Sequence, residues 1–104
     1  MGTYQSDSQG DVLTGQEIDI DEPRMFKVLL HNDNYTTMDF VLYVLETVFY
    51  KSPADATRIM LNVHRNGVGE CGIYPFDVAE SKVDQVHHLA QEHKYPLKSS
   101  MEEV

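Results

Sequence analysis

Apolar residues recur along this chain with two different spacings, one typical of strands and one of helices. Residues 25–30, Met-Phe-Lys-Val-Leu-Leu, form a short β-inclined run that predicts a strand. After a loop rich in Asn and Asp, the spacing i, i+3, i+4, i+7 predicts an amphipathic helix with an apolar face of Met38, Val41, Leu42, Leu45, Val48 and Phe49. Thr36 or Thr37 offers its N-cap, with Asp39 as the capping partner of Thr36.

Two more helices are predicted further along. Ser52 suits an N-cap and Pro53 a first helical position, while Asn66-Gly67 ends the segment. Its inward face is predicted to consist of Ala56, Ile59, Met60 and Val63. A third helix, over about residues 76–93, is predicted to turn inward Ala79, Val83, Val86, Leu89 and Ala90.

Two further strands complete the predicted fold. Residues 68–74 are the weaker candidate because they contain Gly69 and Gly72. Alternating apolar and polar positions predict a final strand over residues 94–101. The order β-α-α-β-α-β predicts an α+β fold, with a small antiparallel sheet of about three strands and three helices on one face.

Charge divides the chain into two parts. Its 104 residues carry a formal net charge of −9, but residues 1–22 contain six of the acidic residues and no Lys or Arg. This segment is also poor in large apolar residues, so we expect a flexible acidic N-terminal extension over 1–22 and one folded domain over 23–104. The lack of a basic stripe argues against nucleic acid and suits cationic ligands.

The cysteine content and the hydropathy of the chain indicate the compartment in which the protein works. The single Cys71 excludes an intramolecular disulfide, which fits a reducing compartment. No apolar run approaches the ~18 residues of a membrane span, and the polar start lacks a signal-peptide core. We therefore expect a soluble, cytoplasmic protein that works without a membrane.

Enzyme chemistry has little support in the residues. The chain has no Gly-rich phosphate loop and no Gly-x-Ser-x-Gly elbow. A metal-dependent hydrolase is the better enzyme candidate, since the metal-ligand types present include His31, Asp33, His64, His87, His88 and His93. There is no His-Glu-x-x-His, however, and the adjacent His87 and His88 point about 100° apart on a helix.

A pocket between two helices is the more informative possibility. Met60, Val63 and His64 share one helix face, and Met38 and Val41 lie one turn apart at the start of the preceding helix. If the helices pack side by side, these apolar groups line a pocket with polar groups at its mouth. Taken alone, Met and Val at helical spacing indicate core packing more often than a site.

Several blocks resemble one family. Residues 32–41, Asn-Asp-Asn-Tyr-Thr-Thr-Met-Asp-Phe-Val, resemble the signature of ClpS, the bacterial adaptor of the Clp protease. Residues 56–64, Ala-Thr-Arg-Ile-Met-Leu-Asn-Val-His, are similar to its next block, and 71–74, 78–83 and 95–97 continue the resemblance in order. It covers about residues 25–102, and several blocks at matching spacing are more specific than one short motif.

The resemblance implies an adaptor, not an enzyme, that binds N-degrons, proteins whose first residue is Leu, Phe, Tyr or Trp. It implies that Asn32 and His64 hold the α-amino group, with Asp33 and Asn34 completing the rim. It implies a side-chain cavity formed by Thr36, Met38, Val41, Met60, Val63 and Leu97, with Met38 as a filter against β-branched first residues. No cofactor or metal is implied.

The resemblance also implies a partner. Asp77, Glu80 and Lys82 match positions that meet the N-terminal domain of the ClpA or ClpC ATPase, to which a monomeric adaptor hands its substrate with the help of its arm. Each is equally compatible with a solvated helix face. Asn34 departs from the family, where many members have an acid, and His31 replaces a usually aliphatic residue.

Two other binding or structural classes remain open. ClpS-like domains also occur inside eukaryotic ubiquitin ligases, but nothing here supplies a RING or another zinc site. A ribosomal-stalk-like structural domain has a similar fold and predicts no affinity for N-terminal Phe or Leu.

Overall fold

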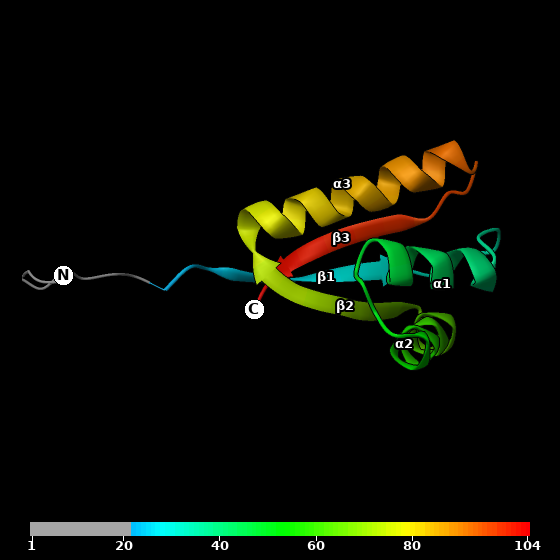
Figure 1. Cartoon of the computed structure of the whole chain (residues 1–104), viewed down its shortest axis with the longest axis horizontal. Coiled ribbons are helices and arrows are strands. Elements are labelled where there is room, and N and C mark those ends of the chain that lie inside the picture. The colour runs from blue at the N-terminus through cyan, green and yellow to red at the C-terminus, as the bar shows by residue number, and fades with distance from the viewer. Residues whose placement is uncertain (1–21) are drawn as a thin grey trace, which may run out of the picture.

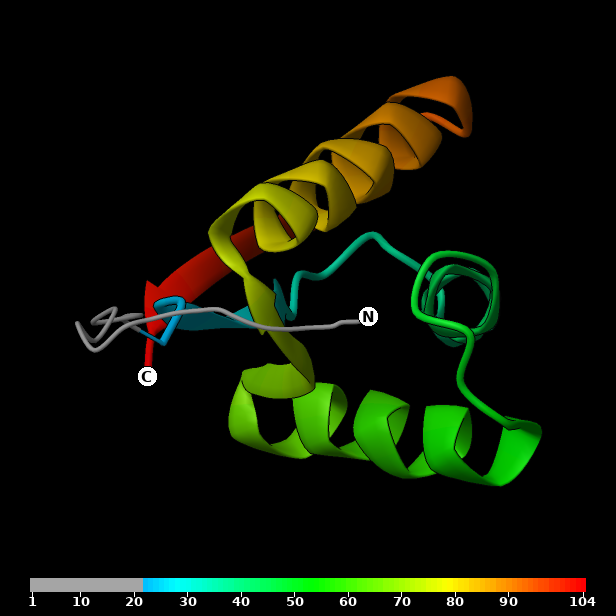
Figure 2. The same ribbon diagram turned by 60° about the vertical axis from the view of Figure 1, so that its left-hand side comes forward.

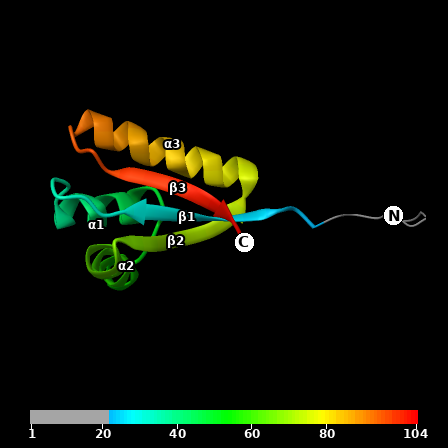
Figure 3. The same cartoon turned by 180° about the vertical axis from the view of Figure 1, so that it is seen from behind.

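The computed structural model describes residues 22–104, in which three strands and three helices follow one another in the predicted order β-α-α-β-α-β (Figure 1). The elements are β1 (Met25–His31), α1 (Met38–Thr47), α2 (Pro53–Asn66), β2 (Val68–Pro75), α3 (Phe76–Glu92) and β3 (Lys98–Glu103). Both β2 and β3 pair antiparallel with β1, giving the sheet order β2-β1-β3 that Figure 3 shows from behind. This confirms the α+β class. Most of the predicted extension, residues 1–21, lies outside the described residues.

The sheet has one face turned to the helices. Alternate residues of β1, Phe26, Val28 and Leu30, are buried in the core, whereas Lys27 and His31 between and beyond them are only half-buried. Figure 2 looks nearly along α1, with α2 and α3 on either side of it. The central strand therefore contributes these alternate side chains to the core that the helices cover, with α2 packed mainly against β2 and α3 packed across the sheet.

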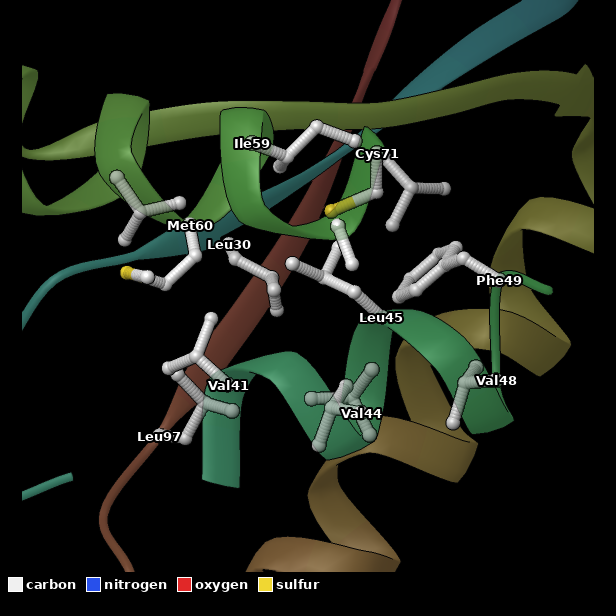
Figure 4. Packing of buried hydrophobic residues seen from close by; sticks show 14 of the residues in the cluster. Leu30, Val41, Val44, Leu45, Val48, Phe49, Ile59, Met60, Cys71 and Leu97 are labelled. Carbon is white, nitrogen blue, oxygen red and sulfur yellow. The ribbon is translucent and has the colours of Figure 1, made fainter. Parts of the chain in front are cut away.

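Side chains from α1 and α2 meet above the sheet to form the core (Figure 4). Val44 and Leu45 of α1 and Ile59 of α2 are almost fully buried beside Leu30. Cys71 of β2 lies in the same cluster, and burial raises its pKa to about 12. The thiol is therefore an inert core group.

The predicted helix caps are present, with one difference. Ser52 accepts a hydrogen bond from the backbone N–H of Asp55, and Gly67 ends α2 in the left-handed region at φ 85°. Helix α1 is capped by Thr37, whose hydroxyl accepts from the N–H of Phe40 at 3.1 Å. The expected pairing of Thr36 with Asp39 is wrong, because Thr36 is bound within the preceding loop.

The last strand begins later than the sequence predicted. Lys94 adopts a left-handed φ of 64°, and residues 94–97 turn the chain before β3 starts at Lys98. Leu97 is nevertheless buried, at 3% exposure, because the turn presses it into the core. Among the described residues, no helix is long and apolar enough to cross a membrane.

Candidate functional site

One pocket of about 260 Å³ opens between the loop after β1, the start of α1 and the C-terminal half of α2. It brings together nine of the ten residues that the sequence grouped into a site, which are Asn32, Asp33, Asn34, Thr36, Met38, Val41, Met60, Val63 and His64. Residues 32–41 and residues 60–64, which are separate in the sequence, thus line a single cavity. We call it the pocket.

The pocket has an apolar interior and a more exposed mouth. Val41, Met60 and Val63 are 6%, 8% and 2% exposed and belong to the core cluster. Met38 is 45% exposed and stands at the first turn of α1, so it lines the pocket without being a core residue. Its position allows it to limit the shape of a group that enters.

Leu97 does not line this pocket. It is buried in the core cluster with Val41 and Met60, and it lines a separate cavity beside α3. Leu97 therefore supports the pocket wall from behind. The sequence placed it in the site through resemblance alone, and hydropathy cannot distinguish a wall from the layer beneath it.

The loop at the mouth is held by Asp33. One carboxylate oxygen, Oδ1, accepts from the backbone N–H groups of Tyr35 at 2.8 Å and of Thr36 at 2.7 Å. The other, Oδ2, accepts from the Thr36 hydroxyl at 2.7 Å. Although burial alone raises it, the pKa of Asp33 lies below its ordinary value because of these hydrogen bonds. The carboxylate is thus ionised at neutral pH, and its three hydrogen bonds lie within the loop.

The opposite side of the mouth is formed by the last turns of α2. His64 is exposed there, in the last turn of the helix. The backbone N–H of Asn32 donates to the carbonyl of Gly67 at 2.9 Å, which ties the loop to the end of the helix. Asn32 and His64, which are far apart in sequence, are therefore held at the same rim.

Sequence reasoning treated Gly69 only as a weakness in a strand. A Cβ at this position would lie 2.7 Å from Cγ2 of Val63 and 3.3 Å from the carbonyl oxygen of Ile59. The glycine thus lets β2 approach α2 closely, directly behind a pocket residue. An isolated glycine within a predicted strand is the signal that indicates such an approach.

A second cavity, of about 450 Å³, adjoins the mouth. It shares Asn32, Asp33 and Asn34 with the pocket. We call it the neighbouring groove; its other lining residues are His31, Tyr35, Pro96 and Lys98. Its existence was not predicted, because strand register brings Lys98 beside His31 and no periodicity in the sequence shows that pairing.

The three residues matched to an ATPase contact differ in their surroundings. Asp77 and Glu80 are exposed on the first turns of α3. Lys82 is half-buried: its Nζ donates to the carbonyl of Val48 at 2.7 Å and lies 4.8 Å from the centre of the Tyr50 ring. Lys82 therefore also fastens α3 to the C-terminal end of α1.

Metal-ligand side chains do not gather in the described part of the chain. Across residues 22–104, no group of three or more His, Cys, Asp or Glu side chains could hold a metal ion. His87 instead accepts a hydrogen bond from the backbone N–H of Ser99 at 3.0 Å, and His93 contacts the Phe40 ring at 5.1 Å between centroids.

The chemistry of the pocket follows from its two parts. Within residues 22–104, no side-chain hydrogen bond engages Asn32, Asn34 or His64, so their acceptor atoms are available to a ligand. An ammonium has three donors and no acceptor, and an apolar group attached to it could enter toward Met60 and Val63. The arrangement suits an amine that carries an apolar side chain.

Several known proteins are similar to this chain in sequence, and one solved structure is similar to it in fold. Residues 21–100 match the family model described as ATP-dependent Clp protease adaptor protein ClpS. The ClpS of Syntrophus aciditrophicus is 59% identical over 83 residues, covering 80% of this chain and 78% of its own. The ClpS of Desulfatibacillum aliphaticivorans is 60% identical over 93 residues, covering 89% of each chain. The structure of Agrobacterium tumefaciens ClpS2 bound to L-phenylalaninamide matches with a TM-score of 0.77 at 35% identity, covering 80% of this chain and all of that one.

Proposed function

Since the chain belongs to the ClpS family of adaptors of the ATP-dependent Clp protease, we propose that its pocket binds the free N-terminal residue of substrate proteins. The chain is an adaptor and not an enzyme. The substrates we propose begin with Leu, Phe, Tyr or Trp. The adaptor delivers them to the ClpA or ClpC ATPase in the cytoplasm.

One observation carries the proposal: an apolar pocket whose rim offers acceptor atoms, with no Lys or Arg among its described lining residues. Val41, Met60 and Val63 provide the apolar interior, and Asn32 and His64 stand at the mouth. Full burial of a Leu or Phe side chain contributes roughly 1.5–3 kcal/mol. The bound L-phenylalaninamide of the Agrobacterium relative has this same combination of an α-amine and an apolar side chain.

The α-amino group distinguishes the N-terminal residue of a substrate from an internal or acetylated residue. An α-ammonium donates charge-assisted hydrogen bonds, whereas an internal or acetylated residue offers one neutral N–H and leaves rim acceptors unpaired. A hydrogen bond to a charged group is worth about 1.5–3 kcal/mol, equivalent to about ten- to a hundredfold in affinity. Acetylation should therefore weaken binding by at least about tenfold.

Fluorescence anisotropy tests the proposal with a Phe-initiated peptide labelled at its C-terminal end. The matched controls are the same peptide with an acetylated N-terminus and one with Gly in first place. We expect only the free Phe peptide to bind tightly. Equal binding of the free and acetylated forms, or no binding at all, would overturn the proposal.

We propose that the ATPase binds at the start of α3, at the exposed Asp77 and Glu80 and the half-buried Lys82. Delivery is tested by degradation of a Phe-initiated reporter protein by the ClpP peptidase with either ClpA or ClpC, in the presence and absence of this chain. Acceleration with one of the two ATPases identifies the partner. A lack of acceleration with both contradicts delivery while leaving peptide binding intact.

A further inference from the structure

The neighbouring groove continues from the mouth of the pocket. Both cavities are lined by Asn32, Asp33 and Asn34, so a chain that leaves the pocket over this segment enters the groove. An extended chain advances about 3.3 Å per residue, which brings the second and third residues of a bound substrate within about 10 Å of the first. The groove is therefore within reach of these two residues.

The groove has the chemistry of an anion site on a polar surface. Lys98 is exposed, and in the described part of the chain no carboxylate forms a salt bridge with it. The one carboxylate in the lining, that of Asp33, already accepts three hydrogen bonds within its own loop. Lys98 is thus the cation of the groove that lacks a partner.

The other lining groups suit a short stretch of polypeptide. Tyr35 is 77% exposed and Pro96 is exposed, so they offer aromatic and aliphatic surface beside Lys98. His31 is held by a 2.7 Å hydrogen bond between its Nε2 and the Ser100 hydroxyl, which fixes the wall at the edge of β3. At 450 Å³ the groove exceeds the pocket itself.

We propose that the neighbouring groove receives the second and third residues of the substrate and that Lys98 favours an acidic side chain there. The inference rests on the proposed function, because the first residue must occupy the pocket. It gives the adaptor a preference beyond the first residue. Exposed ion pairs are weak, so the expected preference is about two- to fivefold and declines as salt screens the charges.

Anisotropy titrations with isosteric peptide pairs test this inference. Each pair begins with Phe and differs by Glu or Gln, at the second position in one pair and the third in the other. We expect tighter binding of a Glu peptide to the unaltered chain at low salt. Lys98→Gln should abolish the preference, whereas Lys94→Gln, which removes the same charge outside the groove lining, should retain it.

The outcomes separate the two proposals. If Phe peptides bind but Glu and Gln are equal in both positions, the inference is wrong and the proposed function stands. A Glu preference that survives in Lys98→Gln also overturns the inference. If no Phe peptide binds, the proposed function and the inference fail together.

Discussion

Thr36 donates two hydrogen bonds to Asp33, from its backbone N–H and from its hydroxyl, both at 2.7 Å. With the third bond from Tyr35, the carboxylate is occupied by the loop that it builds. The resemblance placed Asp33 in the rim around an ammonium. We infer that Asp33 acts there by holding the loop in position. In this view the direct contacts come from the neutral acceptors of Asn32 and His64.

Replacing Asp33 should destabilise the loop in a pH-dependent manner. The pKa of Asp33 lies below its ordinary value of 3.8, so the folded state favours the carboxylate. Its stabilisation is complete well above pH 3.8 and is lost as the pH falls through the folded pKa. We expect Asp33→Asn to lower the free energy of unfolding by about 1–2 kcal/mol at neutral pH and by less near pH 2.5.

Urea unfolding at both pH values measures this difference. Asp84→Asn is the control, since Asp84 is exposed in the middle of α3 and forms no salt bridge within residues 22–104. A loss of stability that is the same at both pH values would show that the ionised carboxylate is not what holds the loop.

Peptide binding should weaken at acid pH because of His64. A neutral imidazole offers a lone pair to the ammonium, whereas a protonated one offers only donors and adds a like charge. We expect the dissociation constant of a Phe peptide to be larger in acid than at neutral pH, because a protonated ring has lost the lone pair that the ammonium needs. His64→Gln, which keeps an acceptor, should flatten that profile. His88→Gln, at an exposed residue of α3 that lines neither the pocket nor the groove, should leave it unchanged, and a flat profile for the unaltered chain would exclude the acceptor role.

Shortening Met38 should widen the choice of first residue. Met38 lines the pocket at 45% exposure, so Met38→Ala should admit β-branched Ile or Val while costing little stability. Anisotropy with Leu-, Ile- and Val-initiated peptides measures the change. If the variant loses stability and all peptide binding together, Met38 acts as a packing residue instead.

Lys82 should prove structural as well as interfacial. Lys82→Met keeps the apolar stem but removes the hydrogen bond to Val48 and the contact with the Tyr50 ring. We expect it to lower the unfolding free energy by about 1 kcal/mol. Asp77→Asn and Glu80→Gln should leave stability unchanged, so any loss of ATPase binding in these two variants reports on the interface alone.

The sequence predicted helices well where a local signal marks their ends. Ser52 and Gly67 bracket α2 as expected, because capping depends on neighbouring residues only. The start of β3 was misplaced because Lys94 takes a left-handed conformation that an alternating pattern does not reveal.

The sequence predicted which site residues share a helix face, but not which of them line a cavity. Helical spacing placed Met60, Val63 and His64 together, but only packing decides that Leu97 lies behind the wall and that Lys98 lies beside His31. The bonds that commit Asp33 and Lys82 depend on loop and interhelical geometry, which a single sequence does not encode in any local pattern.

The 2.9 Å hydrogen bond from Asn32 to Gly67 makes the rim a preorganised receptor. Because the loop and the end of α2 are joined before any ligand arrives, binding has less conformational entropy to lose. The gain in affinity from a rigid rim is expected mainly as a lower dissociation rate constant. A substrate would then remain bound while the unfoldase takes hold of it.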